Sequence, residues 1–250
     1  GKRISETVET FFDRDAAAVR ARAARRLGAI VLASEPRPVA PSAAVADTLA
    51  DGIAARGIDT LAWSKAQLQL RARVALLRAS MADSAKNPWP DLSDAALAAT
   101  TRAWLAPFLQ SKTRASEIDA EDLGNALDTL IPWDLKRQLD ADAPTHFAAP
   151  TGNHHPIIYE GPGAPSLAIR VQELFGLKTH PTVGHGKLPL TLELLSPAHR
   201  PIQITRDLPG FWRGSWADVR ADMRGRYPKH VWPDDPANAA PTARAKPRGT

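Results

Sequence analysis

The chain has 250 residues, of which 44% are hydrophobic and 24% charged, with a formal net charge of +5; these globular proportions exclude a fibrous or wholly disordered protein. The absence of cysteine excludes a disulfide framework, a thiolate metal site and a thiol nucleophile. Because there is no leader pattern, and the apolar run near residues 27–33 is far too short to cross a bilayer, we expect a cytoplasmic protein without a membrane span.

Residues 1–38 form the first predicted part and alternate in the manner of β-strands. Apolar side chains recur between Val8 and Val19, a second apolar run covers residues 27–32, and the pattern ends at Pro36-Arg-Pro38. Two or three strands are expected. Such a piece cannot bury both of its own faces, so it needs a partner sheet or helix.

Residues 41–140 form the second predicted part, a small helical bundle. Helix starts are indicated by capping residues ahead of apolar periods, at Ser42, Ser64, Ser93, Asp119 and Pro132. The strongest signal is the capping box of Ser64 and Gln67, with Trp63 and Leu68 placed as a hydrophobic staple. The first helix should end at Gly57 in a left-handed conformation, and the helix opened by Ser93 should continue to Phe108.

Residues 143–236 form the third predicted part, in which the apolar period changes to that of strands. Runs typical of strands are separated by Gly, Pro and Asn clusters and cover residues 145–149, 156–160, 167–171, 188–195 and 201–205. One closing helix is expected, with Pro209 in its first turn. Trp212 and Trp216 share its apolar stripe, which favours core anchors over the alternative of base-stacking platforms. Residues 237–250 are predicted to be a disordered basic tail.

The basic charge lies mostly at the C-terminal end. From Arg200 onward there are ten Lys or Arg residues against five Asp residues, an excess equal to the net charge of the whole chain. Charge placed in this way favours an anionic partner, nucleic acid first. The closing helix carries Arg213, Arg220 and Arg224 at spacings of 7 and 4, which puts them on one stripe, and the basic surface continues through Arg226 and Lys229. The alternative is a solvated helix face neutralised in part by Asp218 and Asp222.

A second candidate surface lies in the strand-like part of the chain. Arg20, Arg22 and Arg26 would share one face of a strand, beside Arg25, and such a face suits a nucleic-acid backbone. The alternative is an edge strand whose charges discourage aggregation.

The sequence lacks the motifs of three kinds of catalytic chemistry. Gly184-His-Gly-Lys-Leu188 lacks both the first glycine and the hydroxyl of a phosphate-binding loop, so we interpret it as a hairpin turn, and no paired acidic motif for magnesium occurs. The histidines at 154, 155, 180 and 185 lack helical metal-ligand spacing. No G-x-S-x-G elbow is present. We expect no catalytic residue, cofactor site or metal site in this chain.

Several blocks of the sequence, in order, resemble the HrpB-type bacterial ATP-dependent RNA helicases. They are Arg25-Arg-Leu-Gly-Ala-Ile-Val-Leu32, Trp63-Ser64 with Leu70–Arg78, Trp89–Asp94, Trp104-Leu-Ala-Pro-Phe108, Ala143-Pro-Thr-His146, Arg170-Val-Gln-Glu-Leu-Phe-Gly176, Leu194–Ala198 and Thr205–Pro236. The resemblance covers only the part of such a helicase that follows its motor. It implies an α+β fold: a partial OB-like β segment, the helical bundle, and a C-terminal mixed β-sheet domain with a closing helix.

The resemblance also implies partners. An accessory helicase region of this kind would contribute RNA binding or positioning, with single-stranded RNA or another nucleic acid and the motor domains of the same polypeptide as partners. ATP and Mg²⁺ would bind those motor domains, outside this chain. The alternative is a protein-interaction or scaffolding module that docks on the motor or on another protein.

Overall fold

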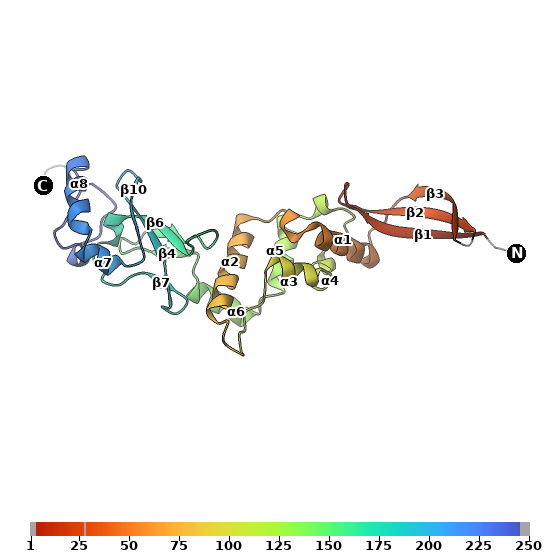
Figure 1. The fold of residues 1–250 in the computed structure, drawn as a ribbon, viewed down its shortest axis with the longest axis horizontal. Helices are drawn as coiled ribbons and strands as arrows, with labels where there is room; N and C mark the ends of the chain where they lie inside the picture. The colour runs from red at the N-terminus through yellow and green to blue at the C-terminus, as the bar shows by residue number, and fades with distance from the viewer. Residues whose placement is uncertain (1–3, 28, 246–250) are drawn as a thin grey trace. The chain divides into compact units, whose positions relative to one another are not determined.

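The computed structural model of the chain describes residues 4–27 and 29–245, and it has the α+β architecture expected from the sequence (Figure 1). The chain divides into two compact units, residues 1–136 and residues 137–250. None of the helices among the described residues is long and apolar enough to span a membrane.

The first unit opens with a three-stranded antiparallel sheet in the order β1-β2-β3. Its strands are β1 (Ile4–Asp13), β2 (Ala18–Leu27) and β3 (Ile30–Arg37). The helices that follow are α1 (Ala43–Arg56), η1 (Ile58–Thr60), α2 (Lys65–Ser80), α3 (Asp94–Ala99), α4 (Thr101–Trp104), η2 (Ala106–Phe108), η3 (Ala115–Glu117) and α5 (Ala120–Asp128). Helix α6 (Trp133–Asp142) begins in this unit and ends in the second.

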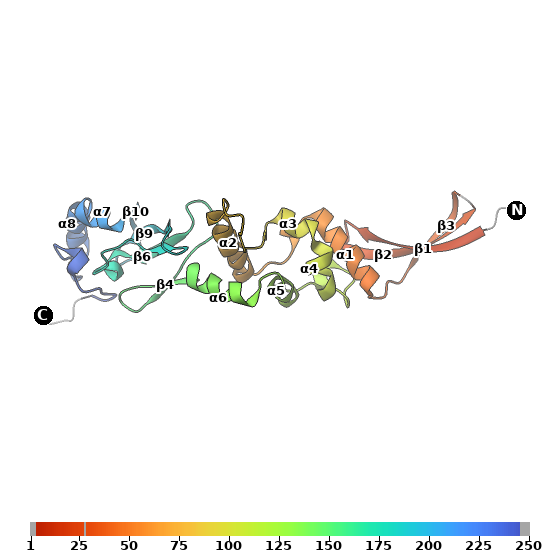
Figure 2. The ribbon, with the colours of Figure 1, turned by 90° about the horizontal axis from the view of Figure 1, so that it is seen from below.

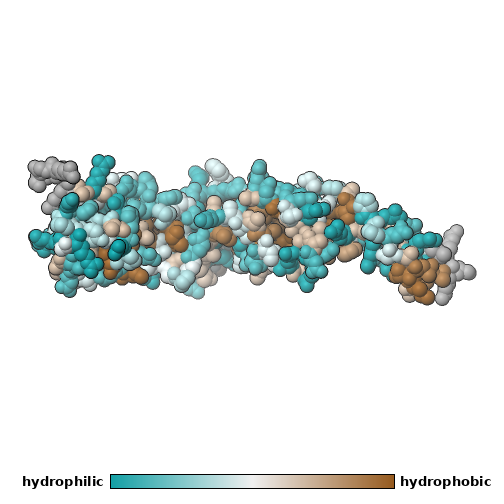
Figure 3. All heavy atoms as spheres, turned by 90° about the horizontal axis from the view of Figure 1, so that it is seen from above, coloured by the Kyte–Doolittle hydropathy of each residue, from teal (hydrophilic) through white to brown (hydrophobic). Residues whose placement is uncertain are grey.

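One end of the sheet is covered by α1. Val19 and the alanines at 21 and 23 are buried in β2, and the ring of Phe12 lies so close to Gly52 of α1 that a Cβ there would overlap it. Small residues therefore permit the helix to approach the strands. Val8 and Ile30 remain 64% and 61% exposed, and Figure 3 shows apolar surface over this sheet.

The predicted helix starts of the first unit are confirmed where they depend on caps. Ser42 accepts a hydrogen bond from the backbone of Val45, and Asp119 caps α5. The capping box of α2 is complete, with Gln67 N–H donating to Ser64 Oγ at 3.3 Å and Ser64 N–H donating to Gln67 Oε1 at 2.9 Å. These interactions are local, so the sequence pattern is sufficient to predict them.

Two details of the helical prediction are wrong. The helix opened by Ser93 does not run to Phe108 but divides into α3, α4 and η2, because Thr100 and Thr101 hydroxyls bond back to preceding carbonyls and Pro107 then follows. Gly57 has a positive φ of 119° but a ψ of 134°, which lies outside the left-handed helical region. Trp63 stacks on Trp104, with ring centroids 6.3 Å apart.

The second unit contains a three-stranded sheet in the order β10-β9-β6, with β6 and β9 parallel, which Figure 2 shows beside α7 and α8. Its strands are β4 (His146–Ala148), β5 (His154–Pro156), β6 (Ser166–Arg170), β7 (Thr182–Val183), β8 (Leu188–Pro189), β9 (Thr191–Leu195) and β10 (Pro201–Thr205). Its helices are η4 (Val171–Leu174), α7 (Leu208–Arg213), α8 (Trp216–Arg226) and η5 (Pro236–Asn238).

Two predicted strands of this unit are placed differently in the structure. In place of the strand expected over 156–160, the structure has β5 at His154–Pro156. The turn in which Ala149 N–H donates to the Asn153 carbonyl puts His154 opposite Ala148, so pairing with β4 begins at His154. The strand expected over 188–195 is divided into β8 and β9, since Pro189 has no N–H and Leu190 N–H bonds to Pro181 instead.

The predicted single closing helix is also wrong. Gly214 has φ −104° and ψ −94°, outside the helical region, so α7 ends here after Gly214 N–H has made the last helical hydrogen bond, to the Gly210 carbonyl. The tryptophans nevertheless act as core anchors as expected. Trp212 and Trp216 are 7% and 2% exposed, and both lie against Phe175.

The start of the predicted disordered tail is ordered in the structure. Gly176 N–H donates to the Pro236 carbonyl at 2.8 Å, Thr242 N–H donates to the Gln172 carbonyl at 3.1 Å, and Arg170 donates to the Ala243 carbonyl at 3.1 Å. Hydrogen bonds from backbone N–H groups and from the Arg170 side chain thus hold residues up to about 243, although the segment has few apolar side chains. Residues 246–250 lie outside the described part of the chain.

Candidate nucleic-acid interface

Arg20, Arg22 and Arg26, the strand trio, lie on one face of β2. Strand pairing places Glu9 of β1 directly opposite Arg22, and Glu9 contacts Arg22 at 3.2 Å and Arg26 at 2.8 Å. Asp13 lies 3.8 Å from Arg20. Hydrogen bonding by Arg22 and the charge of Arg26 lower the pKa of Glu9. The strand trio is therefore already matched by acidic side chains of the neighbouring strand, in exposed pairs of small individual strength.

The break at Gly214 changes the predicted stripe of the closing helix. Arg213 is the last residue of α7, whereas Arg220 and Arg224 belong to α8, so the three do not share one continuous helical stripe. The spacings of 7 and 4 between these arginines would place them on one face only if a single helix contained all three. Arg213 has to be considered separately from the arginines of α8.

Arg220 binds the segment that follows α8 rather than facing solvent freely. Its Nε donates to the Trp232 carbonyl at 3.1 Å, and its Nη2 lies 2.5 Å from Asp234. Arg226 pairs with Asp222 one turn earlier at 3.0 Å. Both arginines therefore stabilise the local structure in the observed conformation.

Arg213, Arg224 and Lys229 form the terminal basic trio. All three are exposed, and none makes an ion pair with another residue of the described chain. Three acids of the same segment are engaged elsewhere: Asp207 caps α7, Asp222 binds Arg226 and Asp234 binds Arg220. The terminal basic trio is thus the part of the predicted basic surface that remains available to an anion.

Glu173 is a buried polar centre with several hydrogen-bond donors around it, and sequence reasoning missed it. Its side chain has no exposed area, and its Oε1 accepts from Arg170 Nε at 3.0 Å. Its Oε2 accepts from Thr151, Asn153 and His155, at 3.1, 2.7 and 3.0 Å. The available signal was an acidic residue within the apolar block 171–175.

The electrostatics of Glu173 favour its ionised form. Burial alone raises the pKa of this carboxyl, but hydrogen bonds from Asn153, His155 and Arg170 outweigh burial and lower the pKa to about 2. Every acceptor position is directed at a donor of the protein itself. We therefore interpret Glu173 as a structural centre that orders the 151–155 loop, rather than as an acid or base for catalysis.

The histidines predicted to be loop residues have separate structural partners. His155 contacts Glu173, His185 lies 2.8 Å from Asp142, and His180 accepts from Leu208 N–H at its Nδ1, 3.0 Å away, while its Nε2 lies 2.8 Å from the Leu190 carbonyl. No group of three His, Asp or Glu side chains that could hold a metal ion occurs among residues 4–27 and 29–245.

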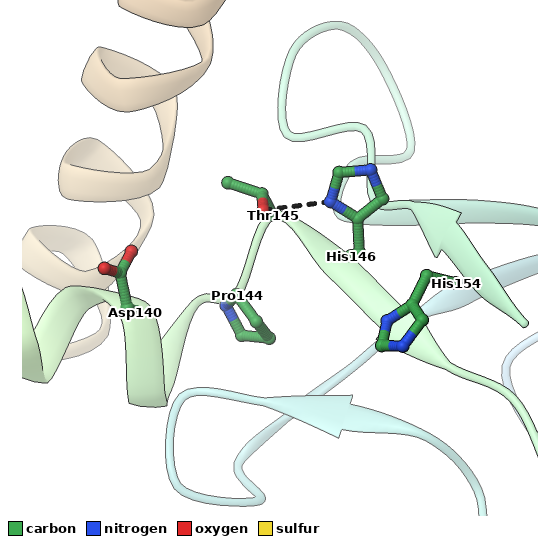
Figure 4. A pocket seen from close by; sticks show the side chains of 5 residues that line it. All are labelled: Asp140, Pro144, Thr145, His146 and His154. Carbon is green, nitrogen blue, oxygen red and sulfur yellow. Dashed lines mark hydrogen bonds between the residues drawn. The ribbon is translucent and has the colours of Figure 1, made fainter. Parts of the chain in front are cut away.

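A shallow cavity of about 450 Å³ lies between the end of α6 and the β4–β5 hairpin (Figure 4). It is lined by Asp140, Pro144, Thr145, His146 and His154. The Thr145 hydroxyl lies 3.0 Å from Nδ1 of His146, as the dashed line in Figure 4 marks. The two imidazoles come from paired strands, but they do not form a metal site with Asp140, because no group of three such side chains that could hold a metal ion occurs among the described residues.

The segment Gly184–Leu188 forms a turn, as predicted. Val183 pairs with Leu188 across the antiparallel β7–β8 hairpin, and Lys187 N–H donates to the Gly184 carbonyl. The backbone is thus engaged in the hairpin.

Comparison with known proteins identifies the class of this α+β chain. The family model described as "ATP-dependent helicase C-terminal", HrpB_C, matches residues 104–236, which is just over half of the chain. The chain belongs to this family.

Particular relatives agree with that assignment. The ATP-dependent RNA helicase HrpB of Escherichia coli K12 is 43% identical over 196 residues, which cover 78% of this chain and 24% of the relative. A crystal structure of the E. coli DExH-box NTPase HrpB matches with a TM-score of 0.78 and 37% identity, over 97% of this chain and 30% of that one. A second, of the E. coli DEAH/RHA helicase HrpB, matches with a TM-score of 0.68 and 32% identity, over 92% and 29%. The chain thus spans about a quarter to a third of the length of these relatives.

Proposed function

We propose that this region binds or positions single-stranded RNA for a helicase motor, and that the terminal basic trio makes the principal contacts. The observation that carries the proposal is the exposure of Arg213, Arg224 and Lys229 without acidic partners, in a unit where most neighbouring acids are occupied internally. A guanidinium group binds phosphate oxygens in a bidentate manner, and lysine adds a point charge. The name of the E. coli relative, an ATP-dependent RNA helicase, makes RNA the first choice among nucleic acids.

The strand trio has a secondary place in this proposal. Its three arginines share a face, but a phosphate would have to compete with Glu9 and Asp13 for them. Contacts of either trio go to the backbone of the nucleic acid, so they supply affinity without sequence preference.

In this proposal, ATP hydrolysis takes place in the motor domains and not in this chain. ATP and Mg²⁺ would bind to motor domains outside these 250 residues, and the motor domains would be the covalent partner of this region. An ATP hydrolysis assay of the isolated chain is expected to give no activity above background. RNA-stimulated hydrolysis by the purified chain would contradict this division of labour.

A second candidate function, docking on protein, is favoured by exposed apolar side chains of the first unit. Val8, Ile30, Val31 and Leu32 are about half exposed or more on the β1–β3 sheet, and Trp133 is 71% exposed at the start of α6. Side chains of this kind are common at protein interfaces. This role is compatible with RNA binding by the second unit.

The affinity for a labelled single-stranded RNA tests the first candidate. Replacing the terminal basic trio by alanine should weaken binding about tenfold or more near 0.1 M salt, because three phosphate contacts are lost. Replacing the strand trio by alanine provides a matched control with the same loss of charge, and it should weaken binding less than about threefold. Wild-type affinity in the terminal variant would contradict the proposal.

A further inference from the structure

A cavity of about 380 Å³ lies between α8 and the turn that joins β9 to β10. This volume is within the range of roughly 300–1,000 Å³ that is typical of small-ligand sites. Its apolar lining is formed by Pro201, Ile202, Val219 and Met223. The cavity belongs entirely to the second unit and is distinct from the terminal basic trio.

Hydrogen bonds fix the wall that the turn provides. Ser196 is buried, and its Oγ accepts from Arg200 N–H at 3.1 Å and lies 3.3 Å from the Tyr227 hydroxyl. The Ser196 N–H donates in turn to the Arg200 carbonyl at 2.8 Å. The turn is therefore closed on itself and tied to the end of α8, so the cavity exists before any ligand arrives.

The charges that line the cavity are of two kinds. Arg226 and Asp222 neutralise each other in an ion pair of 3.0 Å. Arg200, from the turn, and Asp218, from the first turn of α8, line the same cavity, and neither has an ion-pair partner within the described residues. The cavity thus combines an apolar floor, an available cation and an available carboxylate.

A single unpaired nucleotide matches this combination of groups. Its base has apolar faces for Ile202 and Val219, its phosphate is an anion for Arg200, and an exocyclic amino group can donate to Asp218. A mononucleotide unit of an RNA strand reaches such a cavity only when its base is unstacked, which single strands permit.

We propose that this cavity holds one unstacked base of a single-stranded RNA and that Asp218 selects bases that carry an amino group. The proposal rests on the RNA-binding function proposed above, to which it adds base preference. Cytosine and uracil form the sharpest comparison, because position 4 carries an amino donor in cytosine and a carbonyl acceptor in uracil, while the neighbouring N3 is an acceptor in cytosine and an N–H donor in uracil.

The test compares short oligo(C) and oligo(U) strands as probes of the full 250-residue chain. We expect oligo(C) to bind about tenfold more tightly than oligo(U), the value of one good base contact. Asp218→Ala should reduce this ratio to less than about twofold. Because removal of an acid can raise affinity for every strand, the ratio is the readout, and Glu193→Ala, an exposed acid of β9 outside the cavity, is the matched control that should leave the ratio unchanged.

A second variant tests the cavity independently of charge. Val219→Trp fills the apolar floor and should likewise abolish the preference, with thermal unfolding used to verify that the variant is folded. If neither strand binds, the proposed RNA-binding function fails and the base site fails with it. If both strands bind equally, or if Asp218→Ala keeps the preference, the base site is refuted while the RNA-binding function stands.

Discussion

Replacement of Glu173 by glutamine should destabilise the second unit by about 3 kcal/mol. The carboxylate directs one oxygen at Arg170 and the other at Thr151, Asn153 and His155. Glutamine has one acceptor oxygen and one amide NH₂, so either orientation of the amide turns donors toward donors. The substitution also removes the charge that compensates Arg170 in a buried site.

The magnitude follows from two considerations. Lowering the pKa of the Glu173 carboxyl from 4.5 to about 2 corresponds to about 3 kcal/mol of preferential stabilisation of the ionised, folded form. Removal of one partner from a buried ion pair typically costs roughly 3–5 kcal/mol, which agrees. For a chain of this size the loss corresponds to a decrease in melting temperature of about 10 °C.

Urea and thermal unfolding monitored by tryptophan fluorescence provide the assay, since Trp212, Trp216 and Trp232 are buried in the same unit. Glu193→Gln is the matched control, because Glu193 is exposed on β9, and it should change stability by less than about 0.5 kcal/mol. If Glu173→Gln were as stable as Glu193→Gln within that margin, the interpretation of Glu173 as a structural centre would be refuted.

Three further predictions concern pH, packing and surface charge. The pKa of Glu173 in the folded protein lies below its ordinary value of 4.5, so the stabilisation by this carboxylate is complete above about pH 5 and is lost as the pH falls toward 2. The unfolding free energies of the wild type and of Glu173→Gln should therefore converge in acid. Gly52→Ala should lower the free energy of unfolding by about 1–3 kcal/mol, because the added Cβ overlaps Phe12. Gly225→Ala is the control: nothing lies within 4 Å of its added Cβ, so it should be neutral or stabilising by up to about 1 kcal/mol. Equal effects of the two variants on thermal unfolding would contradict the packing of α1 on the sheet. Arg220→Ala should lower the unfolding free energy by about 1–2 kcal/mol, and its RNA affinity should change only by the effect of one lost charge. Arg224→Ala should weaken RNA binding without changing stability. The reverse pattern would contradict the assignment of Arg220 to stability and of Arg224 to RNA contact.

The sequence predicted features that depend on a few neighbouring residues. The caps at Ser42, Ser64 and Asp119 lie where expected, and so does the turn at Gly184, because each depends on interactions within about four residues. The apolar period likewise identified Trp216 as a core residue. The change of period along the chain separated the helical part from the strand-rich parts, and the α+β class was what the family resemblance implied.

Interruptions of regular structure were harder to predict. The apolar residues around Gly214 keep a helical period, yet the glycine ends α7 and a new helix begins at Trp216. Pro189 divides a strand in the same way by removing one ladder hydrogen bond. The apolar period alone does not reveal such breaks, because the side chains before and after the break can still pack into the same core.

The electrostatic environment of the candidate residues required the structure. That Glu9 faces Arg22 depends on the register of β1 against β2, and that Arg220 holds Asp234 depends on how the chain returns after α8. Glu173 is surrounded by groups up to 22 residues away in sequence. The sequence therefore predicted basic candidates, while the structure separates paired arginines from available ones.

The salt dependence of RNA binding tests most directly whether the terminal basic trio contacts phosphates. For single-stranded RNA, the logarithm of the association constant falls with the logarithm of salt concentration by about 0.7 per phosphate contacted. Removal of Arg213, Arg224 and Lys229 together should therefore reduce the slope by about 2, while removal of the strand trio should reduce it by less than about 1. An unchanged slope in the terminal variant would contradict the proposal, because it would mean that these exposed cations do not meet the RNA backbone.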